Sequence, residues 1–193
     1  MADKNNDKST METTEIENGF YISRYWNESL QNETYEKEVS KEFIQFHFCQ
    51  KGEGVFLFNE GNYSFPVQGK NVIVLYNPIQ ALPINLDLHP DSSMVSLVIS
   101  IKKFHGLFSE NSDEIHFLNP ENNSKKYYDT RPFSPAMSVV LSQILEAKIH
   151  DSMKSLYFKG KVYELLSLFF NKNENTNIEQ CPFLVDEENI RKI

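Results

Sequence analysis

Two short apolar runs flank a glycine turn in the segment Phe43-Ile44-Gln45-Phe46-His47-Phe48-Cys49-Gln50-Lys51-Gly52-Glu53-Gly54-Val55-Phe56-Leu57-Phe58. Aromatic and β-branched residues dominate both runs, which is typical of β-strands. Two such runs joined by a short glycine turn predict a β-hairpin. Further runs, each bounded by a turn, follow at 63–67, 72–76, 84–88 and 94–101. Short strands at this spacing predict a sandwich or barrel rather than a sheet of strands alternating with helices.

The hydrophobic period changes beyond Asn119-Pro120. Ser134 followed by Pro135 is typical of a helix N-terminus, and apolar residues then recur every three or four positions as far as Ile149. A second helix is expected over about 153–170, and the short break between the two predicts an antiparallel helical hairpin. Apolar residues cover roughly half of the second helix, which is enough for two packing surfaces. The hairpin is therefore expected either to pair two copies of the chain or to cap the β domain, and the sequence leaves both open.

These patterns divide the chain into six segments. Residues 1–17 are polar and are expected to form a disordered tail, because they hold too little apolar surface to offset the entropy of ordering. The other expected segments are a β domain over 18–118, a connecting loop over 119–132, the helical hairpin over 133–171, a polar linker over 172–185, and the start of a further, truncated domain over 186–193.

The composition excludes several classes of protein. The 193 residues include 19 basic and 27 acidic side chains, and the resulting formal charge of −8 argues against direct binding to nucleic-acid phosphates. No apolar run is long enough to span a membrane, and residues 1–16 contain no apolar segment of a secretion signal. The two cysteines, Cys49 and Cys181, form no disulfide or zinc-binding pattern. We therefore expect a soluble, cytoplasmic protein.

The order of the glycine turns carries a family resemblance. The strand that leads into Gly52-Glu53-Gly54, the turns at Gly61 and Gly69, and the ending Tyr76-Asn77-Pro78 resemble the cupin-like N-terminal domain of AraC-family transcription regulators. Residues 135–170 are similar to the helical pair that follows the barrel in the pyochelin- and yersiniabactin-regulator branch. Residues 187–193 are similar to the opening of the first helix of that family's DNA-binding domain.

The resemblance implies both a fold and a function. The expected fold is mainly β with α: a cupin-like antiparallel β-barrel, or jelly roll, followed by an antiparallel two-helix hairpin. The implied function is a sensor of a small molecule that forms a homodimer through the hairpin, while DNA is bound only by a helix-turn-helix domain missing from this chain. This branch points to a siderophore-like or other extended effector, and it implies neither an enzyme nor contact with a membrane.

The metal ligands of cupin enzymes are not reproduced in this sequence. Such enzymes carry two histidines and a glutamate on the strand before the glycine turn, whereas Gln45 stands at the glutamate position and the upstream Glu36 and Glu38 are not histidines. A site poor in imidazole binds zinc, iron or copper weakly, so we expect no metal or other cofactor. The sequence also lacks a phosphate-binding glycine motif, a nucleophile elbow and a zinc-protease motif.

Small pockets combine a few polar groups with an aromatic lining, and this chemistry indicates four candidate ligand-binding residues. They are Trp26, Gln45, His47 and Tyr76. Gln45 and His47 share one face of their strand, but the sequence does not decide which face points inward. The candidate dimer contacts, all on the second predicted helix, are Leu156, Tyr163, Leu166 and Phe170.

Two alternatives to the sensor remain open at this level. A metal-free cupin enzyme would need a catalytic set of His, Tyr and Glu side chains. A domain without a ligand is the other alternative, because fifteen phenylalanines are enough to fill a small barrel. Dimerisation would then be its only function, and the space inside the barrel separates this hypothesis from the sensor.

Overall fold

The computed structural model describes residues 9–108 and 126–171. Ten strands and three helices follow one another along these residues. The elements are β1 (Ser9–Glu17), β2 (Phe20–Asn27), β3 (Glu33–Lys37), β4 (Phe43–Lys51), β5 (Glu53–Phe58), β6 (Tyr63–Gln68), β7 (Asn71–Tyr76), β8 (Ile84–Leu88), β9 (Ser92–Ser100), α1 (Ile101–Leu107), β10 (Tyr127–Pro132), α2 (Pro135–Leu145) and α3 (Asp151–Phe170).

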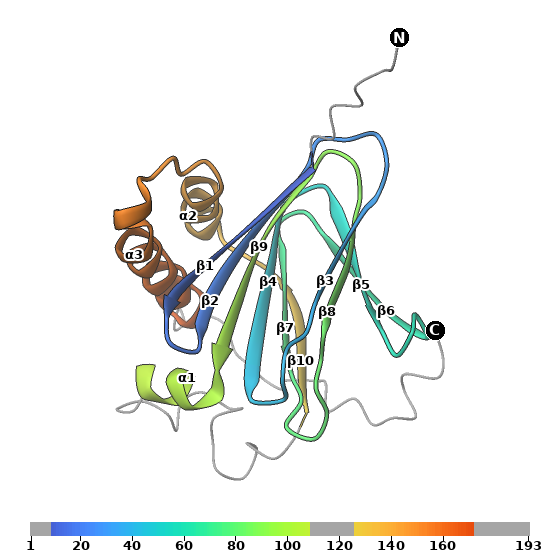
Figure 1. Cartoon of the computed structure of the whole chain (residues 1–193), viewed down its shortest axis with the longest axis horizontal. Helices are drawn as coiled ribbons and strands as arrows, with labels where there is room; N and C mark the ends of the chain where they lie inside the picture. Colours follow the sequence, from blue (N-terminus) through green and yellow to red (C-terminus); the bar gives the residue numbers. More distant parts are fainter. Residues whose placement is uncertain (1–8, 109–125, 172–193) are drawn as a thin grey trace.

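The strands form two antiparallel sheets that pack face to face (Figure 1). The six-stranded sheet has the order β1-β2-β9-β4-β7-β10, and the four-stranded sheet has the order β3-β8-β5-β6. Strands β2 to β9 therefore contribute four strands to each sheet, in the interleaved order of an eight-stranded jelly roll. The predicted jelly roll is confirmed. Among the described strands no ladder joins the two sheets, so the fold is an open sandwich rather than a closed barrel.

Each side of the six-stranded sheet has its own apolar core. Along β4, the even-numbered residues 44, 46 and 48 pack in the layer between this sheet and the helices. The odd-numbered residues 45, 47 and 49 face the four-stranded sheet, because successive side chains of a strand point to opposite faces. Both faces of β4 are thus buried.

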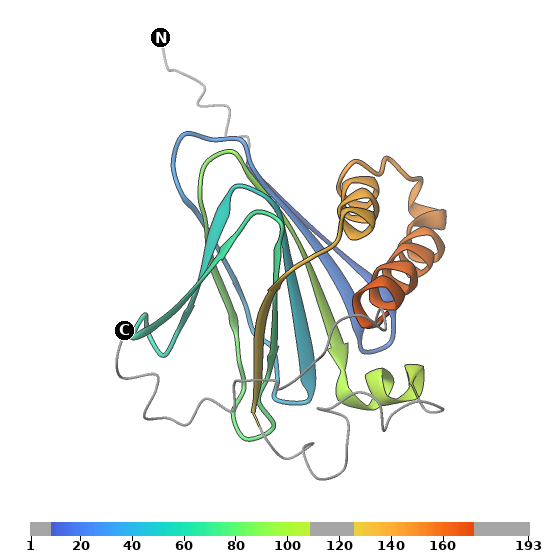
Figure 2. The same cartoon turned by 180° about the vertical axis from the view of Figure 1, so that it is seen from behind.

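Helices α2 and α3 cover the outer face of the six-stranded sheet beside β1, β2 and β9 (Figure 2). The hydroxyl of Ser134 accepts a hydrogen bond from the Met137 N–H at 3.3 Å and caps α2, as the sequence predicts. Gln143 contacts both Tyr157 and Lys161, as expected of antiparallel neighbours. The hairpin is confirmed, although α2 ends at Leu145, earlier than expected, and α3 begins at Asp151.

The structure corrects the predicted disordered tail. Residues 9–17 form β1, which pairs with β2 from Ser9 opposite Asn27 to Glu17 opposite Phe20. Most of the β1 side chains are exposed, and Ile16 is the member that is buried. An argument from apolar surface misses this edge strand, because backbone hydrogen bonds to β2 supply much of what holds it.

The predicted loop over 119–132 is wrong at its C-terminal end. Residues 127–132 form β10, an edge strand that pairs with β7 from Tyr127 opposite Tyr76 to Pro132 opposite Asn71. Proline is tolerated at this position because an edge strand has one side without a strand partner. The predicted linker over 172–185 and the predicted start of a domain over 186–193 lie outside the described residues.

Candidate functional site

A chain of hydrogen bonds runs through the interior between the two sheets. Gln45 Nε2 donates to the Leu82 carbonyl at 2.7 Å, and this contact turns the amide oxygen of Gln45 toward His47. His47 Nε2 therefore donates to Gln45 Oε1 at 3.1 Å, and Ser96 Oγ donates to His47 Nδ1 at 2.7 Å. Gln45 and His47 are both buried, so the structure brings these two candidate residues together inside the core.

His47 is a neutral imidazole in this setting. Its ring is fully buried and lies 4.2 Å from the Phe56 ring, measured between centroids. Burial lowers the pKa of His47 to about 3, because desolvation disfavours the imidazolium. Both ring nitrogens already have hydrogen-bond partners, so His47 offers no vacant position to a ligand.

The buried imidazole predicts a pH-dependent stability. The pKa of His47 is about 3 in the folded chain and near 6.5 in the unfolded chain, so the unfolded state takes up a proton first as the pH falls. The stabilisation is complete above pH 6.5 and declines below it. Between pH 6.5 and pH 5.0 the free energy of unfolding is expected to fall by about 2 kcal/mol from this residue. Urea unfolding across this range measures the slope.

His47→Gln should remove this share of the slope, since glutamine keeps a hydrogen-bonding side chain but does not titrate. The parallel variant His105→Gln, which leaves His47 in place, should retain it. An unchanged slope in His47→Gln would show that the imidazole is not the buried neutral group described here.

Side chains fill the centre of the space between the two sheets. A side chain that is 0% exposed borders no space large enough for a water molecule. The apolar residues of this interior with that value are Tyr25, Cys49, Phe56, Leu86, Leu88 and Met94. Burial also raises the pKa of Cys49 to about 12, which keeps it an uncharged packed thiol. The interior therefore favours the filled barrel over a central ligand pocket.

Trp26 and Tyr76, the other two candidate ligand residues, lie on the opposite face of the six-stranded sheet. Trp26 is half-buried, and the Arg24 guanidinium lies 5.1 Å from its ring centroid. Tyr76 is buried and stands opposite Tyr127 of β10 in the ladder. The four predicted residues therefore do not converge on one site.

Arg24 is a buried cation that the sequence pattern does not predict. Its guanidinium donates to the Ile144 carbonyl at 3.0 Å and to the Ala147 carbonyl at 3.3 Å, at the C-terminal end of α2. It also forms an ion pair with Glu12 of β1 and lies 4.7 Å from the centroid of the Phe158 ring of α3. Positive charge is favourable at a helix C-terminus. Arg24 thus links β2 to β1 and to both helices of the hairpin. The sequence feature that could have indicated this role is an arginine inside the aromatic run of β2.

A groove of about 470 Å³ lies between α2 and the sheet. One wall, called the floor, is formed by β2, β9, β4 and the turn before β7. The opposite wall, called the roof, is formed by the second half of α2. Its lining residues are Trp26, Gln50, Lys51, Lys70, Ser93, Ser142, Leu145 and Glu146. Gln50 Nε2 donates to Ser142 Oγ at 2.8 Å and so joins floor and roof. Trp26 is the one candidate ligand residue that borders this groove.

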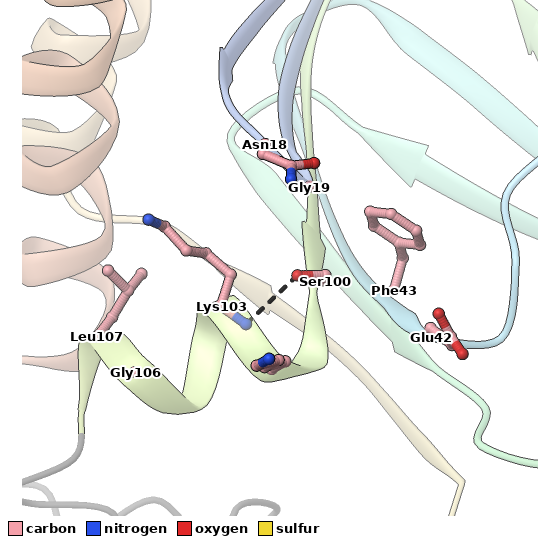
Figure 3. A pocket seen from close by; sticks show the side chains of 9 residues that line it. Asn18, Gly19, Glu42, Phe43, Ser100, Lys103, Gly106 and Leu107 are labelled. Carbon is pink, nitrogen blue, oxygen red and sulfur yellow. Dashed lines mark hydrogen bonds between the residues drawn. The ribbon is translucent and has the colours of Figure 1, made fainter.

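Another open cavity, of about 580 Å³, lies at the end of the sandwich where α1 begins (Figure 3). Its lining residues are Asn18, Gly19, Glu42, Phe43, Ser100, Lys102, Lys103, Gly106 and Leu107. The Ser100 hydroxyl accepts a hydrogen bond from the Lys103 N–H at 3.3 Å and caps α1 (Figure 3). Glu17 forms ion pairs with both Lys103 and Lys159. Because Glu17 neutralises much of the positive charge beside the cavity, the cavity should bind an anion more weakly than its two lysines alone would suggest.

The four predicted dimer contacts divide between core and surface. Leu166 is 2% exposed and belongs to the core, and Phe170 packs on Phe46 with ring centroids 6.1 Å apart. Tyr163 is half-buried, and its ring centroid lies 6.3 Å from that of Phe20. Leu156 is 64% exposed. The structure therefore uses Leu166 and Phe170 within the chain and leaves Leu156 available to a second copy.

Within residues 9–108 and 126–171, no group of three or more His, Cys, Asp or Glu side chains is arranged to hold a metal ion. None of the helices in these ranges is long and apolar enough to cross a membrane. The chemistry that the described cavities offer is hydrogen bonding, charge and contact with aromatic rings.

One protein-family model matches most of the chain. The family model described as the regulatory protein PchR N-terminal domain matches residues 8–180. The chain belongs to this family. The match runs from the start of β1 past the end of α3, so a PchR N-terminal domain comprises both the jelly roll and the helical hairpin. It confirms the resemblance to the pyochelin-regulator branch. No curated protein matches the chain.

Solved structures similar to this chain include ToxT and cupin proteins. ToxT from Vibrio cholerae has a TM-score of 0.41 at 17% identity, over 90% of this chain and 61% of that chain. An apo form of ToxT from strain SCE256 has a TM-score of 0.44 at 16% identity, over 81% of this chain and 60% of that chain. A cupin from Desulfovibrio desulfuricans has a TM-score of 0.36 at 19% identity, over 47% of this chain and 81% of that chain. This chain thus spans about three-fifths of the length of these ToxT chains.

Proposed function

We propose that the chain is the ligand-sensing and dimerisation domain of a cytoplasmic transcription regulator, and that a further domain outside this chain binds DNA. Membership of the PchR N-terminal domain family is the observation that carries this proposal. The formal charge of −8 supports DNA binding by another part of the protein, because affinity for phosphates comes from clustered lysines and arginines. The buried polar groups Gln45 and His47 are used in internal hydrogen bonds, which favours a regulatory domain over an enzyme.

An exposed apolar stripe on α3 supports pairing of two copies. Met153, Leu156 and Gly160 stand at positions i, i+3 and i+7 and so share one face of the helix. Met153 is 49% exposed and Leu156 is 64% exposed, and Val139 on the neighbouring α2 is 58% exposed. Burying such a surface against a second copy removes apolar area from water.

Gly160 adds a second argument for pairing. A glycine inside a helix costs about 1 kcal/mol relative to alanine. A Cβ added at Gly160 would have no neighbouring atom of the described residues within 4 Å. Packing within the chain therefore does not require glycine here. The close approach of a second helix would require a residue without a side chain.

The solution mass of the chain tests this proposal. We expect a dimer at tens of micromolar, and we expect Leu156→Asp to raise the dissociation constant about 100-fold, because an unpaired carboxylate would be buried in the interface. Leu156 is exposed in the single chain, so the variant should remain folded. Gly160→Ala should leave the fold at least as stable while it also weakens pairing. Sedimentation equilibrium measures the masses, and circular dichroism checks the fold.

Leu30→Asp is the matched control, because Leu30 is 95% exposed in the loop between β2 and β3, away from the helices. It should leave the dimer intact. A monomeric wild-type chain, or equal weakening by Leu30→Asp and Leu156→Asp, would contradict pairing through the hairpin.

The filled centre of the interior favours an effector site elsewhere than between the sheets. The family resemblance points to a siderophore-like or other extended molecule, and such a molecule would bind at an open surface cavity. The filled interior also favours a second candidate function, that of a dimerisation domain without an effector. Binding of a small molecule at one of the open cavities distinguishes the two.

A further inference from the structure

The groove beneath α2 has the volume of a small-molecule site. Its volume of about 470 Å³ lies within the usual range for ligand pockets. Strand pairing places three residues of its floor in one row across the sheet. Trp26 of β2 stands opposite Ser93 of β9, and Ser93 stands opposite Lys51 of β4. Trp26 and Lys51 are therefore two strand spacings apart, which is about 10 Å. This length accommodates a molecule with a ring at one end and a charged group at the other.

One end of the groove is cationic. Lys51 comes from β4 and Lys70 from the turn before β7, so the two charges are brought together from different elements. Lys70 donates to Ser138 Oγ at 2.9 Å, and no ion pair joins it to a carboxylate among the described residues. Lys51 pairs with Asp91, and both of these side chains are largely exposed, at 61% and 78%. A solvent-exposed pair is held weakly, which leaves Lys51 able to contact an anion.

The other end of the groove is aromatic and apolar. Trp26 is half-buried and lines the groove together with Leu145 of α2. The Arg24 guanidinium lies 5.1 Å from the centroid of the Trp26 ring. Glu146, the C-cap of α2, is the carboxylate that lines the groove. It is exposed, so its charge can turn into solvent. Among the lining residues the two lysines outweigh this one carboxylate, but Asp91 also pairs with Lys51. The anion would therefore displace Asp91 from Lys51 and bind beside Lys70, which pairs with no carboxylate among the described residues.

We propose that this groove binds a small molecule with a flat ring and an anionic group, the ring beside Trp26 and the anion at Lys51 and Lys70. The inference rests on the proposed function, since it makes the groove the effector site of the sensor. It places that site under α2, the first helix of the hairpin, instead of between the two sheets.

Trp26 is the single tryptophan of the chain, so the groove carries its own reporter. Labelling with 5-fluorotryptophan gives one ¹⁹F resonance. The probes are biphenyl-4-carboxylate, the neutral biphenyl-4-carboxamide and the cationic biphenyl-4-methylammonium, which differ mainly in charge. We expect saturable binding of the carboxylate, with binding of the carboxamide about tenfold weaker and of the ammonium weaker still.

Variants at the charged positions locate the anion. Lys51→Ala and Lys70→Ala are each expected to weaken binding of the carboxylate about three- to fivefold, as for an exposed ion pair. Glu146→Gln should leave binding unchanged or strengthen it. Lys102→Ala is the matched control, because Lys102 lines the cavity at the other end of the sandwich.

Three outcomes would overturn the inference. The ¹⁹F resonance stays fixed with all three probes, the uncharged or cationic probe binds as tightly as the carboxylate, or Lys102→Ala weakens binding as much as Lys70→Ala does. The mass of the chain without probe separates this failure from failure of the proposed function. A dimer that binds no probe would retain the dimerisation domain and lose the groove as a site, whereas a monomer would contradict the proposed function itself.

Discussion

Gly52→Ala is expected to lower the free energy of unfolding by about 4 kcal/mol. Gly52 has a φ of +75°, a conformation that costs a residue with a Cβ about 1–2 kcal/mol. A Cβ at this position would lie 2.0 Å from Ser92 Oγ and 2.8 Å from Ser92 Cα, so the backbone of β9 would have to move. The Ser92 hydroxyl accepts from the Glu53 N–H at 2.9 Å, and displacement would break this hydrogen bond. Urea unfolding measures the loss.

Gly61→Ala is the matched control for the steric part of this effect. Gly61 has a φ of +84°, but no atom lies within 4 Å of the position of its Cβ. Its replacement should therefore cost about 1–2 kcal/mol from the backbone conformation alone. If the two variants lose the same amount, the close approach of Gly52 to Ser92 does not limit this turn.

Arg24→Met is expected to lower the free energy of unfolding by about 3 kcal/mol, since it removes one partner from a buried ionic network. Methionine retains much of the apolar stem, but the carbonyls of Ile144 and Ala147 lose their donor, and Glu12 loses its ion pair. The lost contacts join β1 and α2 to the sheet. Amide hydrogen exchange should therefore be faster at the end of α2, and urea unfolding gives the total cost.

Glu12→Gln provides the comparison for the ionic part of this network. The Glu12 side chain is 47% exposed, whereas that of Arg24 is 4% exposed, so loss of the carboxylate should cost about 1 kcal/mol or less. Equal losses in Arg24→Met and Glu12→Gln would show that the ion pair, and not the capping of α2, is what Arg24 contributes.

The sequence predicts the centre of the fold better than its edges. The run around Gly52 predicts β4 and β5, because apolar strands joined by a glycine turn have few other structures open to them. Ser134 and Pro135 predict the start of α2 by the same local logic. The edge strands β1 and β10 have no comparable signal, since they are held by pairing with β2 and β7 and have few buried apolar side chains of their own.

The candidate site could be predicted only in part, for a different reason. Both faces of β4 are buried, so the residue pattern does not show that Gln45 and His47 point between the sheets. The closure of that interior depends on side chains from the other sheet, such as Phe56 over His47. Arg24 was missed because the Ile144 carbonyl that it binds lies 120 residues further along the chain.

Chemical cross-linking at position 156 tests most directly whether the hairpin pairs two copies of this domain. The variant combines Leu156→Cys with Cys181→Ser and is treated with a short bis-maleimide. Cys49 should not react, because its thiol is buried. We predict a covalent dimer in high yield, and a monomer when Leu30→Cys is treated in the same background. Absence of the dimer at position 156, or equal yields at the two positions, would contradict pairing through the outer face of α3.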